Sequence, residues 1–164
     1  MSSAIIAQAA SETWKQQFEK VSDDYFDKVY FPYAPTSGTL VGYHQYDGQL
    51  EDYSRKTIDA EIAQLKDFQN RIEAIHPDQS PADFVPRSDR EIVLGNIRST
   101  LLTLETIRPW EKNADNYSST CANGAFTLME RKFASPDDRL RSLVSREKQM
   151  PTLLAEARTL MPWP

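Results

Sequence analysis

The chain has 164 residues, of which 40% are apolar and 26% charged, the balance expected of one soluble globular domain with a buried core. Its net charge of −5, without a Lys/Arg cluster that outweighs the neighbouring acids, argues against nucleic acid as a partner. The longest apolar runs are too short to span a bilayer, so we expect no membrane association. A lone cysteine, Cys121, excludes an intramolecular disulfide, and we interpret it as a helix-packing residue rather than a reactive thiol.

Residues 1–10 contain a small apolar patch without a basic region before it, which is not the pattern of a signal peptide. We expect this segment to be disordered. A leader removed before the numbering begins would leave no trace, so the compartment stays open. The cytoplasm is favoured, and export with the leader removed is the alternative.

Apolar residues in the first half of the chain recur every three or four positions, which is the period of amphipathic helices. The first helix is predicted from a cap at Ser11 to Phe31-Pro32, with a stripe of Trp14, Phe18, Val21, Tyr25 and Val29. Residues 36–50 are predicted to be a loop, with a short hairpin around Asp47-Gly48 as the alternative. The second helix is predicted from a cap at Asp52 or Ser54 to His76-Pro77, and it buries Ile58, Ile62, Leu65, Phe68, Ile72 and Ile75.

Two further helices are predicted in the middle of the chain. The third begins at Ser88 and ends at Arg108-Pro109-Trp110, with Val93, Ile97, Leu101, Leu104 and Ile107 on one stripe. Because Leu101 and Leu102 are both apolar, we expect this helix to contact neighbours on two sides and to be the central element. The fourth helix starts near Ser118 or Ser119 and is predicted to bury Ala122, Ala125, Phe126 and Met129.

The segment 131–161 predicts a final pair of helices. Ser135 before Pro136, Asp137 and Asp138 indicates a helix start, because the serine oxygen accepts a free backbone N–H and the carboxylates face the positive end of the helix dipole. The fifth helix is predicted to bury Leu140, Leu143 and Val144 and to expose Arg139, Arg141, Arg146 and Lys148. Pro151 is predicted to end it and to open a sixth helix with Leu153, Leu154, Ala157, Leu160 and Met161 at helical spacing.

The whole pattern predicts an all-α fold, an antiparallel multi-helix bundle or array of about six helices in one domain over residues 1–164. We also expect the last two helices to leave an apolar face uncovered, because the chain stops soon after Leu160-Met161. Exposed apolar faces of this kind are typical of interfaces.

One predicted loop combines several chemically useful side chains. Tyr43, His44, Tyr46 and Asp47 place an imidazole beside two phenols and a carboxylate, so we interpret them as candidates for ligand binding. The alternative is that the tyrosines anchor the loop to the bundle while His44 hydrogen-bonds the backbone. Arg108 and Trp110 are a second binding candidate, for which an anchor at the corner after the third helix is the alternative.

No metal ligand or catalytic residue is predicted. Glu73 and His76 have the Glu-x-x-His spacing of di-iron bundles, but there is no second copy, because Val41 stands three residues before His44. The motifs HExxH, CxxC, GxSxG, GxxxxGK[ST] and GxGxxG are also missing from the sequence. We therefore expect no cofactor in this chain.

Three stretches resemble, in the right order, motifs of a bacterial family, domain-of-unknown-function family 885. Residues 42–54 resemble its G-x-H-x-Y-D-x-x-L-x-D-x-S stretch. Residues 108–117 resemble its RPWxxNPxxY segment, with Ala114 in place of the usual proline. Residues 131–160 resemble its RxFxPxxxRLxxLxxRxxxxPxLLxxAxxxL signature, and the resemblance covers Ser11 to the end of the chain.

The resemblance implies a mostly helical zinc metallopeptidase-like hydrolase of the gluzincin type. Family members are longer, and their His-Glu-Ala-x-Pro-Gly-His zinc segment has no counterpart in these residues. Zinc is therefore expected only for a full-length member, because a zinc hydrolase needs three protein ligands and an open site for water. We expect this chain to be a non-catalytic N-terminal domain that forms a scaffold or cleft wall, with the C-terminal catalytic portion as its partner.

Two other interpretations stay open. The chain could be a free-standing helical interaction or dimerisation module that self-associates and has no enzymatic activity. It could also be a small enzyme that uses His44 with neighbouring acids. The coding sequence downstream of Pro164 would separate the first two interpretations, and zinc-dependent peptidase activity that is lost in His44→Ala would favour the third.

Overall fold

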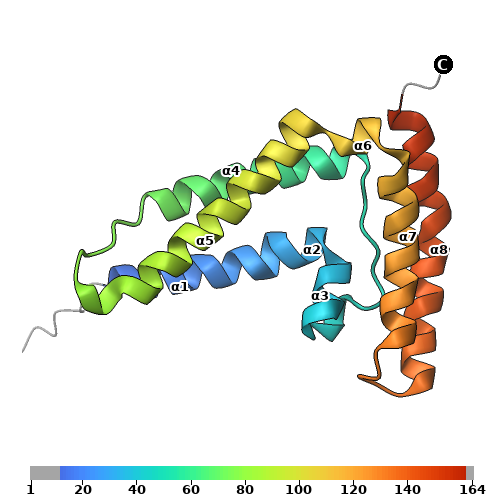
Figure 1. Cartoon of the computed structure of the whole chain (residues 1–164), viewed down its shortest axis with the longest axis horizontal. Coiled ribbons are helices and arrows are strands. Elements are labelled where there is room, and N and C mark those ends of the chain that lie inside the picture. Colours follow the sequence, from blue (N-terminus) through green and yellow to red (C-terminus); the bar gives the residue numbers. More distant parts are fainter. Residues whose placement is uncertain (1–11, 162–164) are drawn as a thin grey trace, which may run out of the picture.

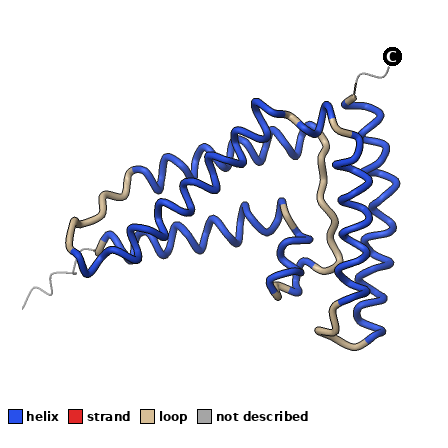
Figure 2. Tube along the Cα trace, in the orientation of Figure 1, coloured by secondary structure: helices blue, strands red, loops and turns tan. Residues whose placement is uncertain are grey.

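The computed structural model describes residues 12–161, and within them it contains helices and loops but no strand (Figures 1 and 2). Six of its α-helices have seven residues or more: α1 (Trp14–Tyr25), α3 (Pro35–Val41), α4 (Arg55–Glu73), α5 (Phe84–Leu101), α7 (Ala114–Glu130) and α8 (Pro136–Leu160). The predicted all-α fold is therefore confirmed. The expected disorder of residues 1–10 and the Ser11 cap lie outside the described residues. No helix in the described part of the chain is both long and apolar enough to cross a membrane.

The first long helix is built as the aromatic stripe predicts, although its cap is Thr13. The Thr13 backbone N–H donates to Gln16 Oε1 at 2.9 Å, and the Thr13 hydroxyl accepts from the Gln16 backbone N–H, so each residue satisfies the other. A wider π-helical turn (Phe26–Tyr30) and the short α2 (Phe31–Tyr33) continue α1. This rod packs against α4 and α5 around the first hydrophobic core: Trp14, Phe18, Tyr25, Val29, Leu65, Phe68, Ile72, Ile75, Val93, Leu94, Ile97 and Leu101.

The third predicted helix begins earlier than expected. Residues 81–83 form a short turn and α5 begins at Phe84, before the predicted start at Ser88. Its π-helical extension (Leu102–Ile107) ends where Arg108 adopts a left-handed conformation with φ 55°. Helix α5 packs on both α1 and α4, as predicted. Leu102 takes no part in this packing, because it is 54% exposed and only Leu101 enters the core.

The second half of the molecule is an antiparallel hairpin of α7 and α8, with the extended segment 49–54 running alongside α7 (Figure 1). Leu50 and Tyr53 of this segment join the helices in a second, smaller core: Tyr117, Cys121, Met150, Leu153, Ala157 and Met161. The corner formed by α6 (Pro109–Lys112) links the two halves, because α6 packs on the π-helical extension of α5 as well as on α7 and α8.

Segment 35–54 and the start of α7 also differ from the predictions. Residues 35–41 form α3, which ends at Gly42 with φ 95°, a left-handed conformation that glycine adopts without strain. Residues 44–46 form a single 3-10 turn, and there is no hairpin at Asp47-Gly48. Helix α7 begins at Ala114, because the Asn113 side chain accepts the Asp115 N–H at 3.1 Å and caps it earlier than Ser118.

The inward faces of α7 and α8 were predicted incorrectly. Phe126 and Met129 are 55% and 57% exposed, whereas Gly124 and Thr127 face inward. Gly124 permits close packing, since a Cβ there would lie 2.7 Å from Leu50 Cδ1. Leu140 and Val144 are exposed and Arg146 is fully buried, the reverse of what was predicted for these three residues, whereas Arg141 and Lys148 are exposed as predicted. The face that packs is therefore the one whose shape and hydrogen bonds fit the neighbouring segments, not the most apolar one.

Pro151 does not end a helix, because α8 runs without a break from Pro136 to Leu160. Proline lacks the N–H that would bond the carbonyl of Glu147. Both residues are exposed, so water can satisfy that carbonyl, and packing of α8 along α7 holds the helix together. The start at Ser135 is as predicted, since its side chain accepts the Asp138 N–H at 3.1 Å.

The α7–α8 hairpin leaves apolar side chains exposed on α8, where an uncovered face was expected, and also on α7, where it was not. They are Phe126, Met129, Leu140, Val144 and Leu154. Leu153 is instead buried in the second core, so the exposed face lies on a different side of α8 from the one that packs.

Candidate functional site

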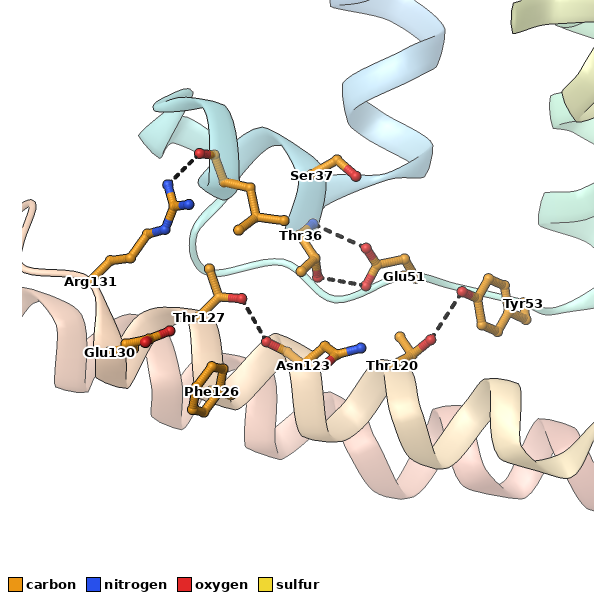
Figure 3. Close-up of a pocket in the computed structure, with 11 residues that line it drawn as sticks. Thr36, Ser37, Glu51, Tyr53, Thr120, Asn123, Phe126, Thr127, Glu130 and Arg131 are labelled. Atoms are coloured by element: carbon orange, nitrogen blue, oxygen red, sulfur yellow. Dashed lines mark hydrogen bonds between the residues drawn. The ribbon is translucent and has the colours of Figure 1, made fainter.

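A pocket of about 510 Å³ lies between α3, the extended segment 51–53 and α7 (Figure 3). Its lining mixes hydroxyl, amide, charged and apolar side chains: Thr36, Ser37, Leu40, Glu51, Tyr53, Thr120, Asn123, Phe126, Thr127, Glu130 and Arg131. We call it the α3–α7 pocket. Three segments distant in the sequence contribute to it, so only the fold creates this site.

The Glu51 carboxylate is held by the first turn of α3. It accepts the Thr36 backbone N–H at 3.0 Å and the Thr36 hydroxyl at 2.9 Å (Figure 3). A carboxylate is favoured there, because the first backbone N–H groups of a helix have no intrahelical acceptor. Glu51 is therefore engaged in fixing the extended segment to α3 and is poorly placed to act as a free base.

The hydroxyl groups of the opposite wall are also engaged. The Tyr53 and Thr120 hydroxyl oxygens lie 3.1 Å apart, and Thr127 donates to the Asn123 backbone carbonyl at 2.8 Å. Burial raises the pKa of Tyr53 above its ordinary value, which keeps its phenol protonated. These contacts give a polar surface without an activated nucleophile.

The groups left available are at the rim and floor of the pocket. Arg131 donates to the Leu40 carbonyl at 2.6 Å and keeps other guanidinium N–H groups exposed, beside the exposed Glu130 carboxylate. The Ser37 hydroxyl and the Asn123 side-chain amide form no hydrogen bond with other described residues, and Asn123 accepts from Thr127 only through its backbone carbonyl. Such a site can offer donors and acceptors to a polar ligand and an aromatic surface, Phe126, to its apolar part.

The predicted site residues Tyr43, His44, Tyr46 and Asp47 lie outside this pocket. His44 Nδ1 is 3.1 Å from Asp47 Oδ2, and its ring stacks on Phe133 at 4.1 Å between centroids. The Tyr46 hydroxyl donates to the Asp27 carbonyl at 3.4 Å. The Tyr46 contact matches the anchoring alternative, whereas His44 contacts the Asp47 side chain and not the backbone. A ligand-binding role for the four residues stays a prediction.

Arg108 and Trp110 form a packed corner. Trp110 is buried and its Nε1 donates to the Leu104 carbonyl at 3.0 Å. Arg108 and Arg55 each place a guanidinium carbon 5.2 Å from the indole, and Arg108 also pairs with Glu111. This arrangement joins α4, α6 and the end of the α5 extension, as the anchor interpretation expects, and ligand binding by the pair stays a prediction.

Arg146 was predicted to be exposed, and the structure shows that it is buried. Its guanidinium is fully buried, with Nη1 donating to the Gly124 carbonyl and Nη2 to Thr39 Oγ1, both at 2.7 Å. Burial lowers its pKa, which Glu51 and Asp47 oppose. An arginine beside an apolar stripe is usually solvated, so its position within the family signature was the only sequence signal for a special role.

A pair of carboxyl groups faces a smaller cavity of about 250 Å³ on the other side of the extended segment. Asp52 and Glu156 both line it, and Glu156 Oε2 is buried without a hydrogen-bond partner among the described residues. Burial, reinforced by Asp52, raises the pKa of Glu156 to about 7. Sequence periodicity gave no sign of this pair, because the two residues are far apart in the chain.

Within the described residues, no group of three or more His, Cys, Asp or Glu side chains could hold a metal ion. The α3–α7 pocket is a cavity with a largely polar lining in an all-α protein. Over residues 35–162 the sequence matches the family described as "Bacterial protein of unknown function (DUF885)". This match covers most of the chain, which therefore belongs to that family, as its motifs indicate. Neither a curated protein nor a solved structure matches the chain.

Proposed function

We propose that this chain is a non-catalytic helical domain of a zinc metallopeptidase-like hydrolase and that its α3–α7 pocket forms part of the wall of the substrate cleft. The observation that carries the proposal is the state of the pocket's polar groups. Glu51 and the Tyr53, Thr120 and Thr127 hydroxyls are committed to internal hydrogen bonds, while Asn123 is available to a ligand. Such a wall binds and orients a substrate, and the reacting groups come from elsewhere.

Binding can be tested by nuclear magnetic resonance on the isotope-labelled chain, with tetra-alanine as the probe. We expect saturable shifts of the Thr36, Thr120 and Asn123 amides. Asn123→Ala should weaken the binding, because it removes the free amide, whereas Asn96→Ala on the exposed face of α5 should not. Absence of shifts at the pocket, or equal binding by both variants, would contradict a role in substrate binding.

The non-catalytic part of the proposal has its own test. The purified chain is incubated with a fluorogenic peptide, with and without added zinc, and no turnover is expected. Zinc-dependent cleavage that disappears in His44→Ala would show instead that this chain is a small enzyme.

An interaction module is the second candidate, favoured by the exposed apolar face of α8. Leu140, Val144 and Leu154 are all exposed. At about 100° per residue, each side chain points within about 40° of their common mean direction around the helix axis, so the three share one face. If this face mediates dimerisation, light scattering should show a dimer that Leu140→Ser dissociates and Leu102→Ser does not. A monomer at every concentration tested would exclude self-association.

A further inference from the structure

Two hollows adjoin along the first helical rod, away from the α3–α7 pocket. One, of about 490 Å³, lies between α1 and α5, and a second of similar volume lies between the end of α1 and the residues around Tyr43. Both are lined by Asp23 and Phe26, so the two hollows adjoin at these residues and we treat them as one groove. We call this the α1 groove. From Lys15 to Phe26 it follows about 16 Å of helix, which equals about three helical turns.

The floor of the α1 groove is aromatic and aliphatic. Phe18 belongs to the first core, Phe26 packs on that core from its edge, and Phe31 stacks on Tyr43 with 4.4 Å between ring centroids. On the α5 side, Ile92 lines the groove and is 65% exposed, and the exposed Val85 lies about two turns earlier on the same helical face, just beyond the lining. A partner that covered this floor would remove apolar surface from water.

The rim of the α1 groove is acidic. Glu19, Asp23, Asp27 and Asp89 line it and are exposed. None of the four forms an ion pair with another described residue. Lys15 is the one basic residue of the lining, and it is already paired with the buried Asp83. The groove therefore presents a negative field that no internal cation neutralises.

We propose that the α1 groove is a docking surface for a basic amphipathic helix of a partner protein. Leucine-like side chains on one face of such a helix cover the floor, as in other helix-in-groove complexes. Its lysines and arginines meet the carboxylates of the rim and the exposed ring of Tyr43, which attracts cations through its π face. The same carboxylates repel nucleic acid and anionic lipid, so a basic protein segment is the chemistry that fits.

The test uses a fluorescein-labelled leucine/lysine amphipathic peptide of about four helical turns, and fluorescence anisotropy reports its binding to the whole chain. We expect saturable binding that weakens as salt rises, because exposed charges are screened. A peptide with glutamate in place of every lysine should not bind. Failure of the lysine peptide to bind, or equal binding of both peptides, would overturn the proposal.

Matched variants distinguish peptide binding by the α1 groove from attraction by the net charge of the whole protein. Asp23→Asn with Asp89→Asn should weaken binding about tenfold, and Ile92→Ser should weaken it about threefold or more, because each removes one component of the contact. The control pair Asp137→Asn with Glu147→Gln has the same net charge, and Leu102→Ser removes an exposed leucine outside the groove. Equal weakening by the control pair would show that overall charge, and not this groove, binds the peptide.

Discussion

Arg146 of α8 donates a 2.7 Å hydrogen bond to the backbone carbonyl of Gly124 in α7, inside a region from which solvent is excluded. The other terminal nitrogen of the same guanidinium reaches Thr39 of α3. One side chain thus ties together three helices that form the α3–α7 pocket and the second core. A charge in this position must be hydrogen-bonded, because an unpaired buried charge is strongly destabilising.

Replacing Arg146 by alanine is expected to lower the free energy of unfolding by about 3 kcal/mol, because it leaves a cavity and removes the two buried hydrogen bonds to Gly124 and Thr39. Arg146→Met should cost less, since the thioether fills the volume and removes the buried charge. Urea denaturation measures both. An alanine variant as stable as the wild type would contradict a structural role for the guanidinium.

Gly124→Ala is expected to destabilise the protein by about 1 kcal/mol, because overpacking against Leu50 outweighs the gain in helix propensity. Gly95→Ala is the matched control, since no atom lies within 4 Å of a Cβ there in α5. That variant should be stabilised by about 0.5–1 kcal/mol. Thermal unfolding measures the midpoint temperature of each variant. If both midpoints shift in the same direction relative to the wild type, the close contact at Gly124 is refuted.

Tyr117→Phe is expected to cost about 1–2 kcal/mol of stability, because the Tyr117 hydroxyl donates at 2.7 Å to the buried carbonyl of Trp110. The loss should loosen the α6 corner that joins the two cores. Urea denaturation gives the cost, and Trp fluorescence reports the corner. Tyr43→Phe, which removes an exposed hydroxyl, serves as the control and should leave both readouts unchanged.

Stability should fall as pH rises through about 7. The folded state raises the pKa of Glu156 to about 7, so the folded protein binds a proton that the unfolded chain releases near 4.5. The contribution of this group is therefore present below about pH 4.5 and lost by the time pH exceeds about 7. Glu61, whose pKa burial also raises to about 7, adds to the same trend.

Urea midpoints measured between about pH 5 and pH 8 test this linkage. Glu156→Gln imitates the protonated carboxyl and should flatten the profile, and adding Glu61→Gln should flatten it further. A Glu156→Gln variant that keeps the slope of the wild type would show that the carboxyl titrates at its ordinary pKa in the folded protein.

The sequence by itself determined the helical class, the start of α8 at Ser135 and the buried stripes of α1 and α4, because these depend on spacing and on capping groups within a few residues. The family followed from three motifs in order. Residues of the α3–α7 pocket were not foreseen, because its hydroxyls and amides lie on segments that no local pattern connects.

Only the tertiary structure decided which faces of α7 and α8 are buried and that Pro151 stays inside a helix. Periodicity predicts that apolar side chains face inward. In the structure, Gly124 instead lets the Leu50 side chain approach α7 closely, and Arg146 donates a hydrogen bond to the Gly124 carbonyl. Shape and hydrogen bonding between distant segments outweigh the apolar pattern there. Those energies exist only after the segments meet, so they leave no mark on the local sequence.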